Sequence, residues 1–203
     1  MARYLDAVRS TLLFAKGVLL VKGDAEQIMI PAMLRAVFGL SPDELGFSVI
    51  SMSSAFFDHI AVVFAEDRIR RPCAIVTDAD EPLIDLPENA EDDTGEQAHA
   101  RAAQLAGEAR TRSLQLLARA NPWIECFLAK HTFEVDFIGA TNDRETVRAL
   151  DTIYADAAAK SRSKKRLESA DLRVAGREIL RLATKVERER LPGGFGPAFL
   201  FNF

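Results

Sequence analysis

The stretch Gly17-Val-Leu-Leu-Val-Lys-Gly-Asp-Ala-Glu26 decides the fold of this chain. Its four successive apolar residues, followed by glycine and then by residues with good helix propensity, indicate a buried strand that turns into a helix. Such a turn places its side chains at the carboxyl end of a strand, the edge where open α/β sheets bind ligands. We therefore expect Asp24 and Glu26 at this edge.

A second stretch of the same kind, Ala74-Ile-Val-Thr-Asp-Ala-Asp80, also ends an apolar strand in carboxylates. Between the two stretches the apolar pattern alternates between strand and helix periods, which predicts a parallel sheet with right-handed crossovers. Parallel strands deliver their last side chains to one edge of the sheet. Carboxylates gathered there would form an oxygen-lined pocket for a hard divalent cation such as Mg²⁺.

The periodicity also predicts where the elements lie along the chain. We expect strands over 18–21, 47–52, 74–77, 123–128 and 132–138. We expect helices over 4–16, 25–38, 56–65, 97–120 and 144–190, the last of these interrupted near Ser161 and Ser163. The helix over 25–38 should bury a face made of Ile28, Met29, Ala32, Met33 and Ala36. The apolar tail, 191–203, should dock on another surface.

Two domains are expected from this pattern. Residues 1–89 and 122–140 would form the α/β domain, and 90–121 and 141–203 a helical domain with the tail. The chain has 203 residues, of which 48% are hydrophobic and 28% charged, which is the balance of a soluble globular protein. No run approaches the roughly 18 apolar residues of a membrane span. Reduced thiols at Cys73 and Cys126 fit a cytoplasmic protein.

The ordered set of segments resembles the Toprim domain, in the version found in the OLD (overcoming lysogenization defect) family of ATPase-coupled nucleases. The matching segments are Phe14 to Val18, Gly23 to Glu26, Pro31, Asp43 to Gly46, Val49-Ile50 and Thr77 to Asp80, with a weaker match at Thr132 to Glu134. The resemblance implies a Toprim-like α/β fold and a DNA endonuclease that hydrolyses phosphodiesters with two Mg²⁺ ions, or with Mn²⁺. It also implies an ATPase-domain partner. The chain has no Gly-x-x-x-x-Gly-Lys-Ser/Thr loop, so we expect a C-terminal fragment or a stand-alone relative. A homo-oligomer is also compatible with the sequence.

The resemblance also implies the site residues. Glu26, Asp78 and Asp80 would act in catalysis and hold the metal, and Glu134 would complete its shell. Each residue also has an ordinary structural interpretation. Glu26 suits the first turn of a helix, the two aspartates suit a strand end, and a strand glutamate commonly faces solvent.

Lys22 departs from the family pattern, which has glutamate at this position. A lysine cannot ligate Mg²⁺, and we expect it to pair with Asp78 or Asp80 and compete with the metal. Pro192 stands where the family has a lysine. Three explanations stay open: reduced nuclease activity, an altered copy, or a shifted site in which Asp24 takes the missing role. The alternative function is therefore a catalytically impaired Toprim-like module that binds DNA or partner subunits. A phosphatase with the Asp-x-Asp motif is disfavoured because Glu81-Pro82 follows the motif.

Charge is unevenly distributed along the chain. Residues 160–190 contain eleven basic and five acidic residues, a net of +6, so the rest of the chain carries −10 to reach the net charge of −4. Residues 78–97 contain nine acidic residues and no Lys or Arg, which indicates a solvated loop. A cationic segment beside a carboxylate site predicts DNA as the partner. The alternative is a solvated helix face with partial i,i+4 pairing.

Overall fold

The structure is a computed structural model that describes residues 14–52 and 57–188. The helix expected over 4–16 lies outside the described residues except for 14–16, which form a turn and a bend. The predictions about the tail over 191–203, and about Pro192 within it, also fall outside the described residues.

The described residues fall into two compact units. The first consists of 14–78, apart from 53–56, together with 108–129, and the second of 79–107 together with 130–188. Each unit has its own buried apolar side chains, such as Leu20 in the first and Ile179 in the second. The long helix α4 (Gly95–Ala120) begins in the second unit and ends in the first.

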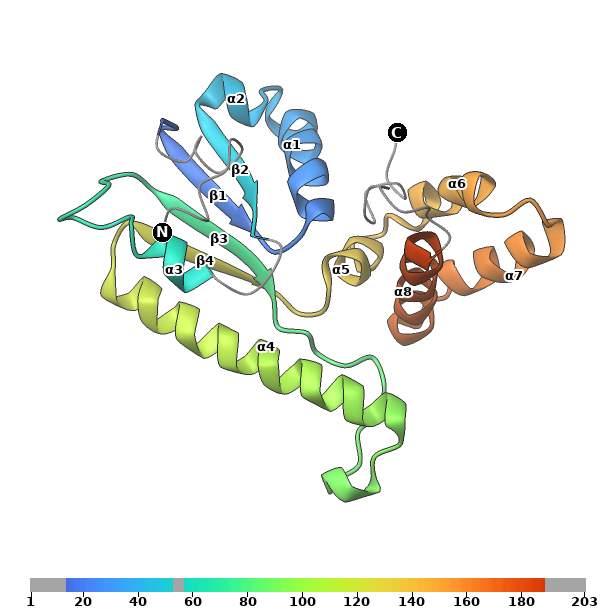
Figure 1. The fold of residues 1–203 in the computed structure, drawn as a ribbon. Helices are drawn as coiled ribbons and strands as arrows, with labels where there is room; N and C mark the ends of the chain where they lie inside the picture. Colours follow the sequence, from blue (N-terminus) through green and yellow to red (C-terminus); the bar gives the residue numbers. More distant parts are fainter. Residues whose placement is uncertain (1–13, 53–56, 189–203) are drawn as a thin grey trace. The chain divides into compact units, whose positions relative to one another are not determined.

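The first unit is built on a parallel sheet of four strands in the order β2-β1-β3-β4 (Figure 1). The strands are β1 (Gly17–Val21), β2 (Phe47–Ser51), β3 (Cys73–Asp78) and β4 (Ile124–Ala129). Every pairing is parallel, and Val21 lies opposite Val76 across the central pair. The predicted α/β fold, a parallel sheet flanked by helices with additional helices, is confirmed.

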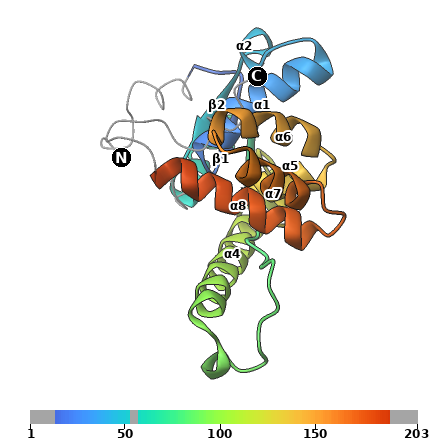
Figure 2. The same cartoon turned by 90° about the vertical axis from the view of Figure 1, so that its right-hand side faces the viewer.

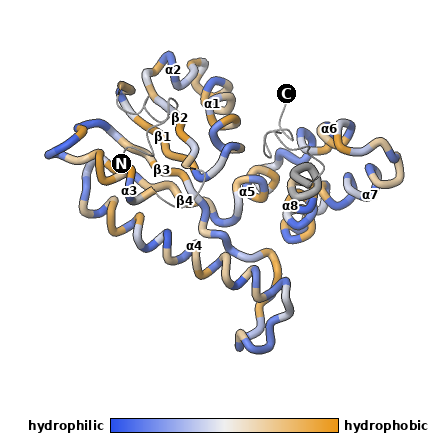
Figure 3. Tube along the Cα trace, in the orientation of Figure 1, coloured by the Kyte–Doolittle hydropathy of each residue, from blue (hydrophilic) through white to orange (hydrophobic). Residues whose placement is uncertain are grey.

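One face of this sheet packs on helices to form the core of the first unit. Alternate residues along the strands point to that face, as the pleat requires, and include the fully buried Leu20 and Ile75. Leu114 of α4 and Phe57 of the short helix α3 (Phe57–Ala61) cover them. The strands stand out as hydrophobic in Figure 3. This packing explains why the second half of α4 belongs to the sheet unit.

Helix α1 (Asp24–Phe38) forms where a helix was predicted, but its predicted buried face is wrong. Of the residues expected on that face only Met29 is buried, whereas Ile28 and Met33 are 48% and 40% exposed. Burial is confined to the first two turns, at Ala25, Glu26 and Met29. The apolar residues Met33 and Val37 of its later turns are in contact with solvent.

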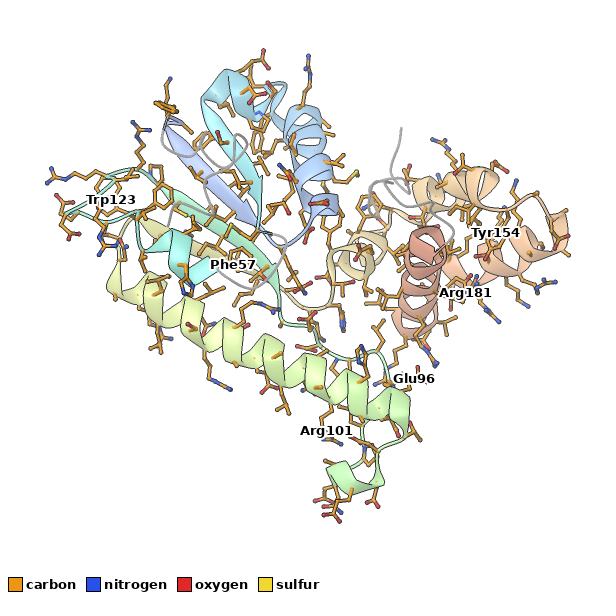
Figure 4. The ribbon with its side chains drawn as sticks, in the orientation of Figure 1. Phe57, Glu96, Arg101, Trp123, Tyr154 and Arg181 are labelled. Atoms are coloured by element: carbon orange, nitrogen blue, oxygen red, sulfur yellow. The ribbon has the colours of Figure 1, made fainter. Side chains whose placement is uncertain are left out.

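After α1, the chain forms a short helix, α2 (Pro42–Leu45). Its N-terminus is stabilised by a capping box between Ser41 and Glu44. The acidic segment after β3 contains only a short 3-10 helix, η2 (Ala90–Asp92), as expected for a loop. It is nevertheless held in place. Arg101 of α4 donates to the Asp93 carboxylate at 2.7 Å and to the Pro87 carbonyl at 2.6 Å (Figure 4).

Both cysteines are free, as expected for reduced thiols, and burial raises the pKa of Cys73 to about 12.

The segment expected to be a strand over 132–138 is instead helix α5 (Phe133–Gly139), so that prediction was wrong. The alternation of Phe133, Val135 and Phe137 is compatible with a strand. Thr132 stands at the N-cap and acidic side chains follow in the first turn, which is a helix start. The rings of Phe133 and Phe137 then lie one turn apart, tilted by 31° to each other, with centroids at 6.2 Å.

Three further helices complete the second unit: α6 (Asp143–Ile153), α7 (Ala157–Leu167) and α8 (Leu172–Arg188). Figure 2 shows them grouped with α5. The interruption predicted near Ser161 and Ser163 is wrong, because both residues lie inside α7. Ser163 is buried there and donates a hydrogen bond to Glu178 of α8. The helices break instead at 154–156 and 168–171.

The unit boundaries differ from the expected domains in two places. Residues 108–120 join the sheet unit through the packing of Leu114, and 130–140 join the helical unit. The second difference follows from α5 being a helix, because it packs against α8: a Cβ at Gly139 would touch Leu172 at 3.4 Å. Among the described helices, none is long and apolar enough to cross a membrane.

Candidate metal centre

Asp78, the last residue of β3, is the centre of a charged cluster in the first unit. Because Val21 pairs with Val76 in parallel register, Lys22 at the end of β1 and Asp78 reach the same edge of the sheet. The Lys22 ammonium donates to Asp78 Oδ1 at 2.6 Å. The expected pairing of Lys22 with an aspartate at the strand end is therefore present at Asp78.

A second cation reaches the same carboxylate from helix α4. Arg110 Nη2 donates to the backbone carbonyl of Asp78 at 2.7 Å and to its Oδ1 at 3.1 Å. The Arg110 side chain is only 11% exposed and Asp78 only 6%. One guanidinium thus holds both the strand end and its carboxylate, which fixes the direction in which Asp78 points.

Nothing in the local sequence marks Arg110 as a residue of this cluster. In a helix rich in Ala, Leu, Arg and Glu, one more arginine is a typical surface residue. The inward position of Arg110 can be recognised only when the buried face of α4 is known, because Arg110 precedes the fully buried Leu114 by one helical turn.

Glu26 is the second buried carboxylate of this unit. It lies in the first turn of α1, directly after β1, and is 7% exposed. Its carboxylate folds back over the turn, since a Cβ at Gly23 would lie 3.0 Å from Glu26 Oε2. The helix N-terminus favours an anion there. Asp24, two residues earlier, is exposed.

The remaining predicted ligands, Asp80 and Glu134, belong to the second unit. Asp80 adopts a left-handed backbone conformation with φ of 54°, which aspartate tolerates better than most residues. Helix α4 passes close to this turn, because a Cβ at Gly107 would lie 2.2 Å from the Ala79 carbonyl oxygen. Glu134 lies in the first turn of α5 rather than on a strand.

The structure therefore brings Lys22, Asp78 and Arg110 into direct contact and places Glu26 in the same unit. Over residues 14–52 and 57–188, no three carboxylate, imidazole or thiol side chains are grouped as a metal site. The predicted ligands are divided between units, with Asp24, Glu26 and Asp78 in the first and Asp80 and Glu134 in the second. The metal site stays a prediction.

The chemistry of this edge nevertheless suits a hard cation. Buried carboxylate oxygens are the ligands that Mg²⁺ and Mn²⁺ prefer. The Lys22 ammonium already occupies one oxygen of this edge, because it lies 2.6 Å from Asp78 Oδ1. A metal ion and the ammonium would therefore compete for one oxygen, as expected for a lysine at this position.

Comparison with known proteins agrees with this fold. Residues 13–80 match a family model described as the TOPRIM domain of proteins like the overcoming lysogenization defect (OLD) protein. The C-terminal region of the Burkholderia pseudomallei OLD protein has a similar structure, with 19% identity, a TM-score of 0.64, and coverage of 92% of this chain and 87% of that one. A structure of the C-terminal region of the Xanthomonas campestris pv. campestris OLD protein has 16% identity and a TM-score of 0.60, covering 94% and 83%. The search of curated proteins found no match.

Proposed function

Because this chain carries a TOPRIM domain of the OLD-like family, we propose that it is the metal-dependent catalytic region of a DNA endonuclease of that family. The observation that carries the proposal is the position of two buried carboxylates. Asp78 is the last residue of β3, and Glu26 lies in the first turn of the helix that follows β1, so both stand at the carboxyl ends of hydrogen-bonded central strands. This is the edge of an open α/β sheet where ligands bind.

Phosphodiester hydrolysis requires that negative charge on the attacking and leaving oxygens is stabilised. Bound Mg²⁺ or Mn²⁺ supplies that stabilisation and lowers the pKa of a bound water. We propose Glu26, Asp78 and Asp80 as the residues that hold it, with Glu134 and Asp24 as further ligands. Arg110 is a positioning residue in this proposal, because it holds both the carbonyl and the carboxylate of Asp78.

A specific observation favours a second candidate function. Asp78 accepts hydrogen bonds from two cations, Lys22 at 2.6 Å and Arg110 at 3.1 Å. A carboxylate neutralised in this way is a weaker metal ligand, because a divalent cation must displace one of its partners. The alternative is therefore a catalytically impaired Toprim-like module that binds DNA or partner subunits. In both cases we propose a cytoplasmic protein that works with an OLD-type ATPase domain, and a homo-oligomer is compatible with either.

Cleavage of supercoiled plasmid in Mg²⁺ or Mn²⁺ tests these functions. The chains to compare are the parent, Lys22→Glu, Asp80→Ala and Lys16→Glu. Lys16 precedes the opposite end of β1, so its reversal changes the net charge equally and leaves the Asp78 cluster intact. We expect Lys22→Glu to cleave faster than the parent, while Lys16→Glu cleaves as the parent does.

The outcomes separate the two candidates. Cleavage by the parent that Asp80→Ala abolishes supports the endonuclease. Cleavage by Lys22→Glu alone supports an impaired site. If no chain cleaves and all bind DNA in a salt-sensitive manner, the endonuclease proposal fails and the binding module is favoured.

A further inference from the structure

Helix α7 has a composition unlike that of any other described helix in the second unit. It contains five basic residues and no acidic one between Ala157 and Leu167, and the basic residues are Lys160, Arg162, Lys164, Lys165 and Arg166. Its inward face is narrow, because only Ser163 and Leu167 are buried. The side chains of Arg162, Lys164 and Lys165 are exposed.

Some of these cations are paired within the unit. Lys160 pairs with Asp151, and Arg166 donates to Glu178 of α8 at 3.2 Å. Lys164 has only a long, exposed contact of 3.7 Å with Glu168, one turn ahead, which stabilises little. Arg162 and Lys165 have no acidic partner within the part of the chain that the structure describes.

The arginines of α8 are different, although they belong to the same cationic segment of the sequence. Arg173 pairs with Asp85 at 2.9 Å, Arg177 with Glu96 at 3.2 Å, and Arg181 with Glu178. Glu96 and Arg181 can be located in Figure 4. Two carboxylates of the acidic segment after β3, Asp85 and Glu96, therefore pair with Arg173 and Arg177 of α8. The excess positive charge that the sequence shows is concentrated on α7.

The surface chemistry of α7 selects the kind of partner. Protein interfaces need buried apolar anchors at their centre, and amphipathic membrane helices need a bulky apolar face. None of the exposed large hydrophobic side chains of the described residues lies on α7. A face of arginine and lysine with only alanine and serine between them fits a polyanion held by charge, such as the phosphate backbone of nucleic acid.

We infer that the exposed side of α7 that carries Arg162 and Lys165, with Lys164 at its edge, binds the phosphate backbone of the DNA substrate. The inference rests on the proposed function and names the surface that holds the DNA while the carboxylate edge acts on it. Contacts of this kind are independent of base sequence. They make the affinity fall with rising salt, because each neutralised phosphate releases counterions.

The test is DNA binding measured in EDTA, so that metal binding and cleavage play no part. The affinity of a fluorescent DNA duplex is measured by anisotropy across a range of salt concentrations. The variant is Arg162→Gln with Lys165→Gln. The matched control is Arg173→Gln with Arg177→Gln, which removes the same charge from two arginines of α8 that have acidic partners. Thermal unfolding of each chain establishes that it is folded.

We expect the α7 variant to bind roughly tenfold more weakly, with a slope of log K against log salt shallower by about 2. The control should bind as the parent does. Equal losses in both variants would overturn the inference, because total charge would then explain the effect. Unchanged affinity in the α7 variant, or no binding by the parent, would also overturn it. If poly-glutamate binding is lost while DNA binding is unchanged, the face belongs to an acidic polypeptide instead.

These results are separate from the plasmid assay. Unchanged DNA affinity in the α7 variant, with normal cleavage by the parent, would remove the inference and leave the endonuclease intact. If the α7 variant binds DNA more weakly, as expected, but no chain cleaves the plasmid, the α7 surface would belong to a DNA-binding module without nuclease activity.

Discussion

At the scale of single residues, the chemistry of the sheet edge depends on what surrounds one carboxylate. Asp78 is buried, and a buried charge must be paired. Lys22 and Arg110 satisfy that need from within the protein. A chain with glutamate in place of Lys22 would lose one of these partners and gain an anion. Arg110 would then face two carboxylates, and an added cation would be stabilised beside them, as in carboxylate clusters that bind metal.

Gly107 is the residue on which the turn at Ala79 and Asp80 depends. A methyl group at Gly107 would lie 2.2 Å from the Ala79 carbonyl oxygen, so the helix or the turn must move. We expect Gly107→Ala to lower the free energy of unfolding by about 2 kcal/mol. This is opposite to the usual effect of replacing glycine within a helix. Chemical denaturation measures the change.

Gly95, in the same helix, provides the control for Gly107. No heavy atom lies within 4 Å of a Cβ built there. Gly95→Ala should leave the free energy of unfolding unchanged or raise it by up to about 1 kcal/mol. If the two variants behave alike, the close approach of α4 to the turn is wrong.

At the scale of elements, a buried carboxylate joins α7 to α8. Glu178 of α8 is 2% exposed and accepts hydrogen bonds from Ser163 and Arg166 of α7 and from Arg181. Arg181 in turn donates to the Tyr154 hydroxyl at 2.6 Å, after the end of α6 (Figure 4). This network explains why Ser163, at which the sequence predicts a helix break, lies inside α7.

The network predicts how stability depends on pH. Burial raises the pKa of Glu178, but the hydrogen bonds from Arg181, Ser163 and Arg166 outweigh burial and lower it below 4.5. A lowered pKa in the folded state means that the stabilisation is complete above pH 4.5 and is lost as the pH falls below it. We expect Glu178→Gln to lower the free energy of unfolding by about 1–3 kcal/mol at neutral pH.

Denaturation of the parent and of the variant at several pH values tests this. The difference between them should shrink as the pH falls through the acid range. Glu168→Gln is the control, because its contact with Lys164 is exposed and 3.7 Å long, and it should change the stability by less than about 0.5 kcal/mol. A difference that stays constant with pH would show that Glu178 acts through packing alone.

At the scale of the whole molecule, metal binding and folding are linked. A ligand that binds only the folded state stabilises it by about 2.7 kcal/mol at a hundredfold excess over its Kd. For a chain of this size, that raises the Tm by about 5–10 °C. We expect Mn²⁺ to produce such a rise in Lys22→Glu and a smaller one in the parent. Without metal, Lys22→Glu should be the less stable chain, because like charges then lie close together.

Thermal unfolding with and without Mn²⁺ measures this linkage independently of cleavage. Lys16→Glu, with the same charge change at the other end of β1, should respond as the parent does. An equal rise in the parent and in Lys22→Glu would show that Lys22 does not compete with the metal. No rise in any chain would contradict the proposed metal site.

Local patterns in the chain were enough to predict most of its elements. Short apolar runs specify the strands of a parallel sheet, and the turn after Val21 specifies where its carboxylates emerge. The Ala- and Leu-rich stretch specifies α4. The charge of Lys22, and therefore its attraction to a neighbouring aspartate, is also a property of the sequence.

Long-range contacts decided the rest. The alternation of apolar residues over 133–138 fits a strand and the Thr132 cap fits a helix, and packing against α8, far away in the chain, decides between them. The burial of α1 depends on how far the helix extends along the sheet. Arg110 becomes part of the carboxylate cluster only because Leu114 turns that side of α4 inward. Likewise, which arginines remain available to a partner depends on the acidic side chains beside them, and these come from a distant segment. Sequence periodicity reports only neighbours within a few turns, so it carries no information about such pairs.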